Sequence, residues 1–333
     1  TVITNVLWCR PDDNKIPPTF SPSECTRRHL NPFLVSHARS LIVAVGETAM
    51  TSLFKTGPIT KWRGSLVDGK FGKTLIILHP SYIVRGNWEL MPTLGADLRK
   101  GLRYLKDPSP ITENYIMSPT IDQIKVCAAR LLEADAIAFD IENTYSGALL
   151  CISFACKDFV LCIPLQNGLI PFYSSDDESE AVRLIGEILE SPIPKIIQNK
   201  IHDIYHLEEL GFEINGIKHD TLVAHHTLYP ELPHRLDFLS SIYTNVPYYK
   251  AMTKNDEDEK VAMVEIPIKT LQEYNCKDSF VTLQIYDSLE EDLKKSNLFG
   301  FYEGQSKLVD VLIGMTRRGI RVDIKTMVEE RER

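Results

Sequence analysis

Short apolar runs separated by turn residues characterise the N-terminal third of the chain. Residues 41–45 and 75–78 (LIVAV and LIIL) are continuous apolar stretches, and a helical pattern over 47–54 follows Gly46. Apolar runs of this length, bounded by turns and followed by helices, predict buried strands of a parallel sheet. Two prolines within residues 107–110 then predict the end of this domain.

The next segment, up to residue 302, combines three adjacent strand-like runs with several helical patterns. The strand-like runs cover residues 136–141, 149–154 and 159–163, and a fourth covers 195–198. Helical spacing occurs at 121–133, 178–190, 203–210, 221–228, 236–243 and 268–295. Neighbouring strands followed by alternating strands and helices predict an α/β domain with a mixed sheet.

A final helical pattern covers residues 308–323 and breaks at Gly319, and ten residues follow residue 323. We therefore expect three parts: a domain over 1–106, a second over 107–302, and the truncated start of a third over 303–333. The first residue is Thr rather than Met. These features predict that the sequence is a fragment of a longer protein.

The composition is that of a soluble globular protein, with 44% hydrophobic and 25% charged residues among 333. No run of 18 apolar residues occurs, which excludes a spanning helix and predicts no membrane partner. Seven cysteines, none in a CxxC pair, do not form a disulfide pattern. They favour a reducing cytoplasm.

Charge is divided unevenly along the chain. Residues 1–110 carry 15 Lys+Arg against 8 Asp+Glu, whereas residues 111–333 carry 22 against 37. A basic segment attracts phosphates directly, but an acidic one repels them unless cations lie between. Ordinary surface variation explains the same asymmetry unless the acidic part contains metal ligands.

Asp140 and Glu142 close the first strand of the second domain. Side chains alternate along a strand, so these two carboxylates share one face. Their mutual repulsion favours a divalent cation with oxygen ligands, such as Mg²⁺. A strand that simply ends in a polar turn has the same pattern, so the pair requires further ligands.

Two later elements supply further acidic groups. Asp203 lies where a strand gives way to a helix, a position that a helix-capping carboxylate also occupies. Tyr274 and Asp278 are four residues apart within a helix and therefore lie on one face. A surface pair would show the same spacing.

The order DxE, Asp and YxxxD resembles the three motifs of the DEDD 3′–5′ exonucleases, with Tyr274 marking the DEDDy subtype. The stretch from His219 to Leu239 is similar to the matching helices of the proofreading domains of family A DNA polymerases. This resemblance, over about residues 115–300, implies a ribonuclease-H-like fold and hydrolysis of phosphodiesters with two Mg²⁺ or Mn²⁺ ions. Residues 308–323 resemble the segment that opens the polymerase domain in that family.

The resemblance implies a role for each matched residue. Asp140 would bridge both metal ions, with Glu142 and Asp278 completing the first site and Asp203 holding the second. Tyr274 would orient the attacking water, and Asn199 would contact the substrate backbone. The implied partners are the single-stranded 3′ end of DNA, primer-template DNA and a polymerase domain in cis. The implied setting is the cytoplasm of a bacterium or a phage-infected host, near the nucleoid.

The N-terminal domain has a signature of its own. Cys9-Arg-Pro, Cys25, the strand and turn LIVAVGETA, Trp62-Arg-Gly and His79-Pro-Ser…Arg85 follow one another. This order resembles the family-4 uracil-DNA glycosylases, which have a three-layer α/β/α fold. The resemblance implies that Cys9 and Cys25 ligate an iron–sulfur cluster and that His79 and Arg85 face DNA.

The sequence lacks the other two cysteines and the uracil-pocket motif of that family, which precede the Cys9 segment there. A cluster would therefore require further cysteines upstream of Thr1. Three alternatives remain open: a uracil-DNA glycosylase with an ancillary nuclease, a non-catalytic DNA-binding module, and an exonuclease that acts on RNA. Cys9 and Cys25 as plain buried thiols are a further alternative.

Overall fold

The computed structural model describes residues 2–8, 22–37, 39–54, 57–108, 112–255 and 259–331. Contacts divide the molecule into two compact units. Unit 1 comprises Thr1–Asn114 and Tyr229–Val261, and unit 2 comprises Tyr115–Leu228 and Ala262–Arg333. Residues 229–261 thus pack with unit 1, although they lie in the middle of the segment predicted as the second domain.

Unit 1 contains a three-stranded sheet in the order β1 (Ile42–Val45), β3 (Gly72–Ile77) and β2 (Leu66–Gly69). β1 and β3 are parallel, which confirms the parallel pair predicted from the two apolar runs. β2 is antiparallel to β3 and was not predicted, because its sequence LVDG offers only two apolar positions.

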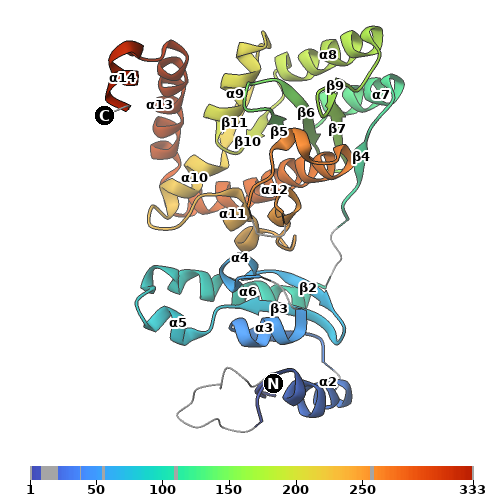
Figure 1. Cartoon of the computed structure of the whole chain (residues 1–333), viewed down its shortest axis with the longest axis vertical. Coiled ribbons are helices and arrows are strands. Elements are labelled where there is room, and N and C mark those ends of the chain that lie inside the picture. Colours follow the sequence, from blue (N-terminus) through green and yellow to red (C-terminus); the bar gives the residue numbers. More distant parts are fainter. Residues whose placement is uncertain are drawn as a thin grey trace. The chain divides into compact units, whose positions relative to one another are not determined.

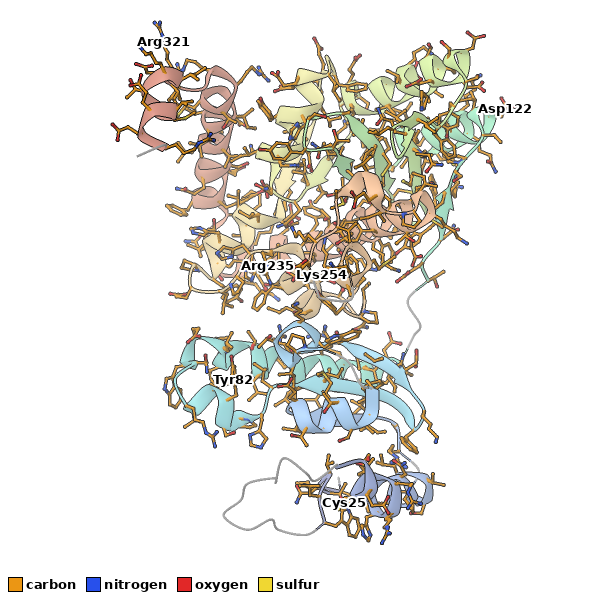
Figure 2. The ribbon with its side chains drawn as sticks, viewed as in Figure 1. Cys25, Tyr82, Asp122, Arg235, Lys254 and Arg321 are labelled. Atoms are coloured by element: carbon orange, nitrogen blue, oxygen red, sulfur yellow. The ribbon has the colours of Figure 1, made fainter. Side chains whose placement is uncertain are left out.

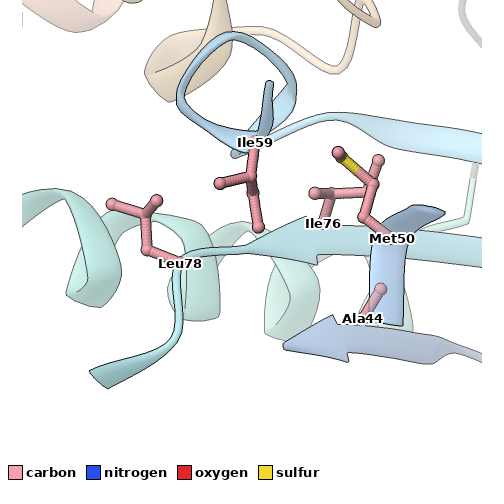
Figure 3. Close-up of a cluster of buried hydrophobic side chains, with 5 residues drawn as sticks. All are labelled: Ala44, Met50, Ile59, Ile76 and Leu78. Atoms are coloured by element: carbon pink, nitrogen blue, oxygen red, sulfur yellow. The ribbon is translucent and has the colours of Figure 1, made fainter. Parts of the chain in front are cut away.

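Each face of this sheet has its own apolar cluster. One cluster comprises Ala44, Met50, Ile59, Ile76 and Leu78 (Figure 3). The other comprises Leu66, Leu75 and Ile77, with Leu41, Leu94 and Tyr104 packed against it. The first involves α3 (Glu47–Phe54) and α4 (Ile59–Trp62), and the second involves α6 (Met91–Lys106). Helices on both faces give the predicted three-layer α/β/α arrangement.

The remaining elements of unit 1 are short. Before the sheet lie α1 (Pro22–Cys25), the π-helix η2 (Thr26–Leu30) and α2 (Asn31–Ser36). Between β3 and α6 lie α5 (Pro80–Val84) and the 3-10 helix η3 (Trp88–Leu90). Residues 229–261 add α11 (Leu236–Tyr243) and the 3-10 helix η4 (Lys250–Thr253), and Figure 2 labels Arg235 and Lys254 in this segment.

A buried charged cluster joins residues 229–261 to the rest of unit 1. Arg63 donates from Nε to Asp97 Oδ2 at 2.9 Å and from Nη1 to Ser241 Oγ at 2.8 Å. Lys100 donates to the carbonyl of Gly64 at 2.7 Å and also to that of Ser241. The exposed fractions of Arg63, Asp97 and Lys100 are 3%, 0% and 1%. Opposite charges and carbonyl dipoles therefore replace water around all three groups.

Unit 2 contains a six-stranded mixed sheet. Its strands are β11 (Ile217–Asp220), β10 (Lys195–Ile197), β5 (Ile137–Asn143), β6 (Leu149–Ala155), β7 (Val160–Pro164) and β4 (Tyr115–Met117), in that spatial order. The pairs β5–β6 and β6–β7 are antiparallel. The pairs β10–β11, β10–β5 and β4–β7 are parallel. The predicted mixed α/β sheet is confirmed.

Some short strands were missed. β4 and β11 were not predicted, nor was the hairpin of β8 (Gln166–Asn167) and β9 (Ile170–Pro171). The helix predicted over 221–228 is confirmed as α10 (Thr221–Leu228), and His219 and Asp220 end β11 directly before it. These two polar residues interrupt the apolar pattern of β11, which parallel pairing with β10 stabilises.

Helices surround the sheet of unit 2. They are α7 (Ile121–Leu132), α8 (Ser175–Glu190), α9 (Lys200–Glu209), α10 (Thr221–Leu228), the 3-10 helix η5 (Met263–Glu265), α12 (Ile268–Lys295), α13 (Phe299–Arg318) and α14 (Ile324–Arg331). Figure 1 shows the long α12 lying across β5, β6 and β7. Thr120 and Gln123 form a capping box at the start of α7. α13 begins at Phe299, well before the predicted pattern at 308. Among the described residues, no helix combines the length and the apolar composition that a membrane span requires.

Candidate active site

β5 presents its two carboxylates to α12. Asp140 pairs in the sheet with Ser153 of β6, and Glu142 pairs with Cys151. The Ser153 hydroxyl donates to the carbonyl of Asn275 in α12 at 2.9 Å, so this face of the sheet carries the helix. Because strand side chains alternate, Phe139 points to the opposite face. The sequence pattern thus directs both acidic groups toward one helix.

α12 completes an acidic cluster. Tyr274 and Asp278 are one helical turn apart and only 7% and 5% exposed. One ligand atom each from Asp140, Glu142 and Asp278 lies within 4.8 Å of the others. The structure therefore brings together three of the predicted acidic residues, from elements more than a hundred positions apart in the sequence.

Asn275 was missed by the sequence analysis. Its Nδ2 atom donates to Asp140 Oδ2 at 2.8 Å and to the Asp140 carbonyl at 3.1 Å, and Asn275 is fully buried. This amide fixes the orientation of one carboxylate of the cluster. Its position between Tyr274 and Asp278, on the buried face of α12, was the available signal.

Asp203 lies in the first turn of α9 and is 4% exposed. His202 Nδ1 lies 2.8 Å from Asp203 Oδ1, while Oδ2 is buried with no hydrogen-bond partner. Burial raises the pKa of Asp203 well above its usual value, and the charges of Asp220 and Asp278 raise it further. Asp278 links Asp203 electrostatically to the acidic cluster.

The Tyr274 hydroxyl stays protonated at neutral pH. Burial raises its pKa, and the negative charges of Asp278, Glu142 and Asp140 raise it further. A protonated phenol beside carboxylates can donate a hydrogen bond but supplies no base. The arrangement suits a residue that orients a water molecule.

The acidic residues fit divalent cations. Magnesium and manganese prefer carboxylate oxygens. The cluster supplies three such oxygens, all within 4.8 Å of one another. Asp203 adds a buried carboxylate oxygen that hydrogen bonds do not satisfy. Like charges held this close together are stabilised by a cation between them.

Asn199 has a backbone role in the structure. It precedes α9 with φ 64° and ψ 62°, a left-handed conformation that Asn tolerates better than most residues. Its N–H donates to Asp220 Oδ1 at 3.1 Å, and the residue is exposed. The predicted contact of Asn199 with substrate stays a prediction.

The predicted DNA-facing residues of unit 1 lie at the two ends of α5. His79 caps the helix, since the N–H of Ser81 donates to His79 Nδ1 at 3.1 Å, and Arg85 follows the last turn. Both are exposed. Gly46 follows β1 with φ 86° and lies close to His79, because a Cβ on Gly46 would be 3.1 Å from the Cβ of His79. The ends of β1 and β3 are therefore side by side. Contacts of His79 and Arg85 with DNA stay predictions.

Of the two cysteines predicted to ligate an iron–sulfur cluster, the structure describes one. Cys25 is partly exposed at the end of α1 and is labelled in Figure 2, while Cys9 lies outside the described residues. All six described cysteines are free.

A known protein family matches the part of the chain that carries the acidic cluster. The model described as 3′–5′ exonuclease, of the DNA polymerase A type, matches residues 115–294. The chain therefore belongs to the 3′–5′ exonuclease family of the family A DNA polymerases. The predicted resemblance to the exonuclease domains of the family A DNA polymerases is confirmed.

Two curated relatives of different kinds are similar to the chain. DNA polymerase I of Synechocystis is 30% identical over 171 residues, which is 48% of this chain and 17% of the polymerase. Type-4 uracil-DNA glycosylase of Thermotoga maritima is 35% identical over 109 residues, which is 31% of this chain and 56% of the glycosylase. The chain is thus similar in part to a polymerase and in part to a glycosylase, and it spans less than a fifth of that polymerase.

Among solved structures, ribonuclease D of Escherichia coli is similar with a TM-score of 0.47 and 18% identity, over 63% of this chain and 52% of that chain. The catalytic core of RRP6 from Trypanosoma brucei is similar with the same TM-score, 0.47, and 20% identity, over 60% and 52%.

Proposed function

We propose that unit 2 removes nucleotides from the single-stranded 3′ end of DNA by metal-dependent hydrolysis. The observation that carries this proposal is the convergence of Asp140, Glu142 and Asp278 within 4.8 Å. The match to the exonuclease family and the polymerase relatives support DNA as the substrate. Proofreading for a polymerase domain in cis belongs to the same proposal.

The position of each residue in the site suggests its role. Asp140, Glu142 and Asp278 would hold one divalent cation, and Asp203 together with Asp140 would hold a second. Bound Mg²⁺ or Mn²⁺ would make a water molecule a stronger nucleophile at neutral pH and stabilise the leaving 3′ oxygen. Tyr274 would orient that water through its protonated hydroxyl.

The electrostatics of the chain support this division. Residues 111–333 carry 22 basic against 37 acidic side chains, a surface that repels the phosphates of DNA by itself. Cations in the acidic cluster would offset this repulsion where the scissile phosphate binds. The buried amide of Asn275 would keep Asp140 oriented between the two cation sites.

The test is digestion of a 5′-labelled single-stranded DNA oligomer with Mg²⁺, with Mn²⁺ or with EDTA. We expect a ladder that shortens from the 3′ end and is absent with EDTA. Asp140→Ala should slow cleavage on the order of 10³-fold, because several kcal/mol of charge stabilisation are lost. Tyr274→Phe should keep the ladder but slow it, since the cation ligands remain.

Asp122→Ala is the matched control, because Asp122 is an exposed carboxylate in the first turn of α7. It should cleave like the wild type. A matched RNA oligomer in parallel tests the substrate class. Equal cleavage by wild type and Asp140→Ala would overturn the proposed site, and faster cleavage of RNA would overturn the DNA assignment.

A further inference from the structure

α13 lies outside the part of the chain that matches the exonuclease family, residues 115–294, yet it packs within unit 2. Its buried face carries Tyr302, Val309 and Ile313. Residues 302, 306 and 310 follow one another at intervals of four, so they form one stripe along the helix. This stripe contacts the start of α9, which carries Asp203.

The first connection runs through Tyr302 and Asp220. The N–H of Asp220 donates to the Tyr302 hydroxyl oxygen at 2.9 Å, and these residues are 1% and 2% exposed. The Asp220 carboxylate in turn accepts from the N–H groups of Asn199 at 3.1 Å and Lys200 at 2.9 Å. Those two groups are among the four N–H groups that have no partner within the helix where α9 begins.

Asp220 also fixes the start of its own helix. Oδ1 accepts from the N–H of Leu222 at 2.9 Å and from that of Val223 at 3.4 Å. One buried carboxylate therefore joins the first turns of α9 and α10. The left-handed Asn199 needs this support, because its side chain makes no capping hydrogen bond.

The second connection runs through Lys200, which is 2% exposed. Its Nζ donates to the Ser306 carbonyl at 2.8 Å and to Asp310 Oδ1 at 2.6 Å. At the far end of α9, Arg317 pairs with Glu208. α13 thus holds α9 at both ends, and Asp203 lies three residues after Lys200.

We infer that α13 positions the second cation site: Tyr302, through Asp220, and Asp310, through Lys200, hold the first turn of α9 so that Asp203 faces the acidic cluster. This inference rests on the proposed function, because it concerns the cation that Asp203 would hold. Tyr302, Asp220, Lys200 and Asp310 are positioning residues, since none belongs to the acidic cluster itself. The exonuclease site therefore extends beyond the segment that the family match covers.

The test is binding of Mn²⁺ to the full chain, followed by electron paramagnetic resonance of the free ion, beside the DNA digestion assay. The wild type should bind a tighter and a weaker ion, and Asp203→Asn should lose the weaker one. Tyr302→Phe and Asp310→Asn should weaken only the weaker site, by about 10-fold to 100-fold, as expected when the support of a ligand is removed. Cleavage by both variants should recover at saturating Mn²⁺.

Two control variants match these changes. Tyr286→Phe removes another tyrosine hydroxyl beside His219, but that hydroxyl bonds Glu290 of its own helix. Lys307→Met removes an exposed charge from α13. Both should bind Mn²⁺ and cleave DNA like the wild type.

The outcomes separate the two proposals. Wild-type protein that neither binds Mn²⁺ nor cleaves DNA would overturn the proposed function and this inference together. Wild-type cleavage with unchanged Mn²⁺ binding in Tyr302→Phe and Asp310→Asn would overturn the inference alone. Equal weakening of both sites, with a lower unfolding temperature, would also overturn it, because α13 would then only stabilise the fold. Asp310 is 62% exposed at its side chain, so Asp310→Asn keeps the test valid if Tyr302→Phe does not fold.

Discussion

In unit 1 the buried charges of Arg63 and Lys100 surround the carboxylate of Asp97, whereas in unit 2 the carboxylates of Asp140, Glu142 and Asp278 lie beside one another. The first cluster combines both signs and extends over two parts of the sequence. The second gathers one sign at the end of a strand and on a helix. Mixed charges serve the packing of unit 1, while like charges at this distance are typical of a site that binds cations.

The largest expected difference between the two clusters is the change in stability when each loses one carboxylate. Asp97→Asn should lower the free energy of unfolding of unit 1 by about 3–5 kcal/mol, because Arg63 stays buried without its counter-charge. Asp278→Asn should not lower the stability of the metal-free protein, since it relieves repulsion. The three tryptophans, Trp8, Trp62 and Trp88, all lie in unit 1, so urea unfolding followed by their fluorescence measures Asp97→Asn directly. Circular dichroism at a helix wavelength follows Asp278→Asn. The comparison fails if both variants lose the same stability.

Cations should act on one unit only. At a concentration one hundred times the dissociation constant, Mn²⁺ should stabilise unit 2 by about 2.7 kcal/mol, as expected for a ligand that binds only the folded state. Helix unfolding of unit 2, followed by circular dichroism, should shift to higher temperature, while the tryptophan signal of unit 1 should not. Asp140→Ala should abolish the shift. A shift of the tryptophan signal as well would mean that the cation binds elsewhere.

The smallest expected effect is a pH dependence of unit 1. Burial lowers the pKa of Lys100 to about 7, from an ordinary value of 10.5 that the unfolded chain regains. Between these values the unfolded state binds more protons, so stability rises with pH in this window and is lower, and constant, below about pH 7. Relative to Lys100→Met, the wild type should gain about 1–2 kcal/mol from pH 7.5 to 9, measured by tryptophan fluorescence. Parallel pH profiles of the two proteins would contradict the assignment.

A long or strictly alternating pattern within one element predicts its structure most accurately. The bounds of α11 and α12 agree with the predicted helices at both ends, and the alternation along β5 placed Asp140 and Glu142 on one face. β11 was missed because its residues Ile-Lys-His-Asp carry little apolar signal, and its pairing with β10 decides its conformation.

Interactions between residues distant in the sequence leave no local pattern. Arg63 and Ser241 are 178 positions apart, so no local pattern reports the hydrogen bond that places residues 229–261 in unit 1. The role of Asn275 likewise depends on where α12 crosses β5. The family resemblance supplied the roles of the acidic residues, which no pattern of one sequence can give.

Residues 229–261 have a practical consequence for dividing this chain. They fall within the segment that matches the exonuclease family, but Ser241, Phe238 and Tyr248 contact Arg63 and Trp62. A protein that starts after residue 107 would carry α11 into solvent without these partners and expose aromatic surface. Recombinant work on the nuclease is therefore best done with units 1 and 2 expressed as one polypeptide. A truncated protein that starts after residue 107 would tend to aggregate.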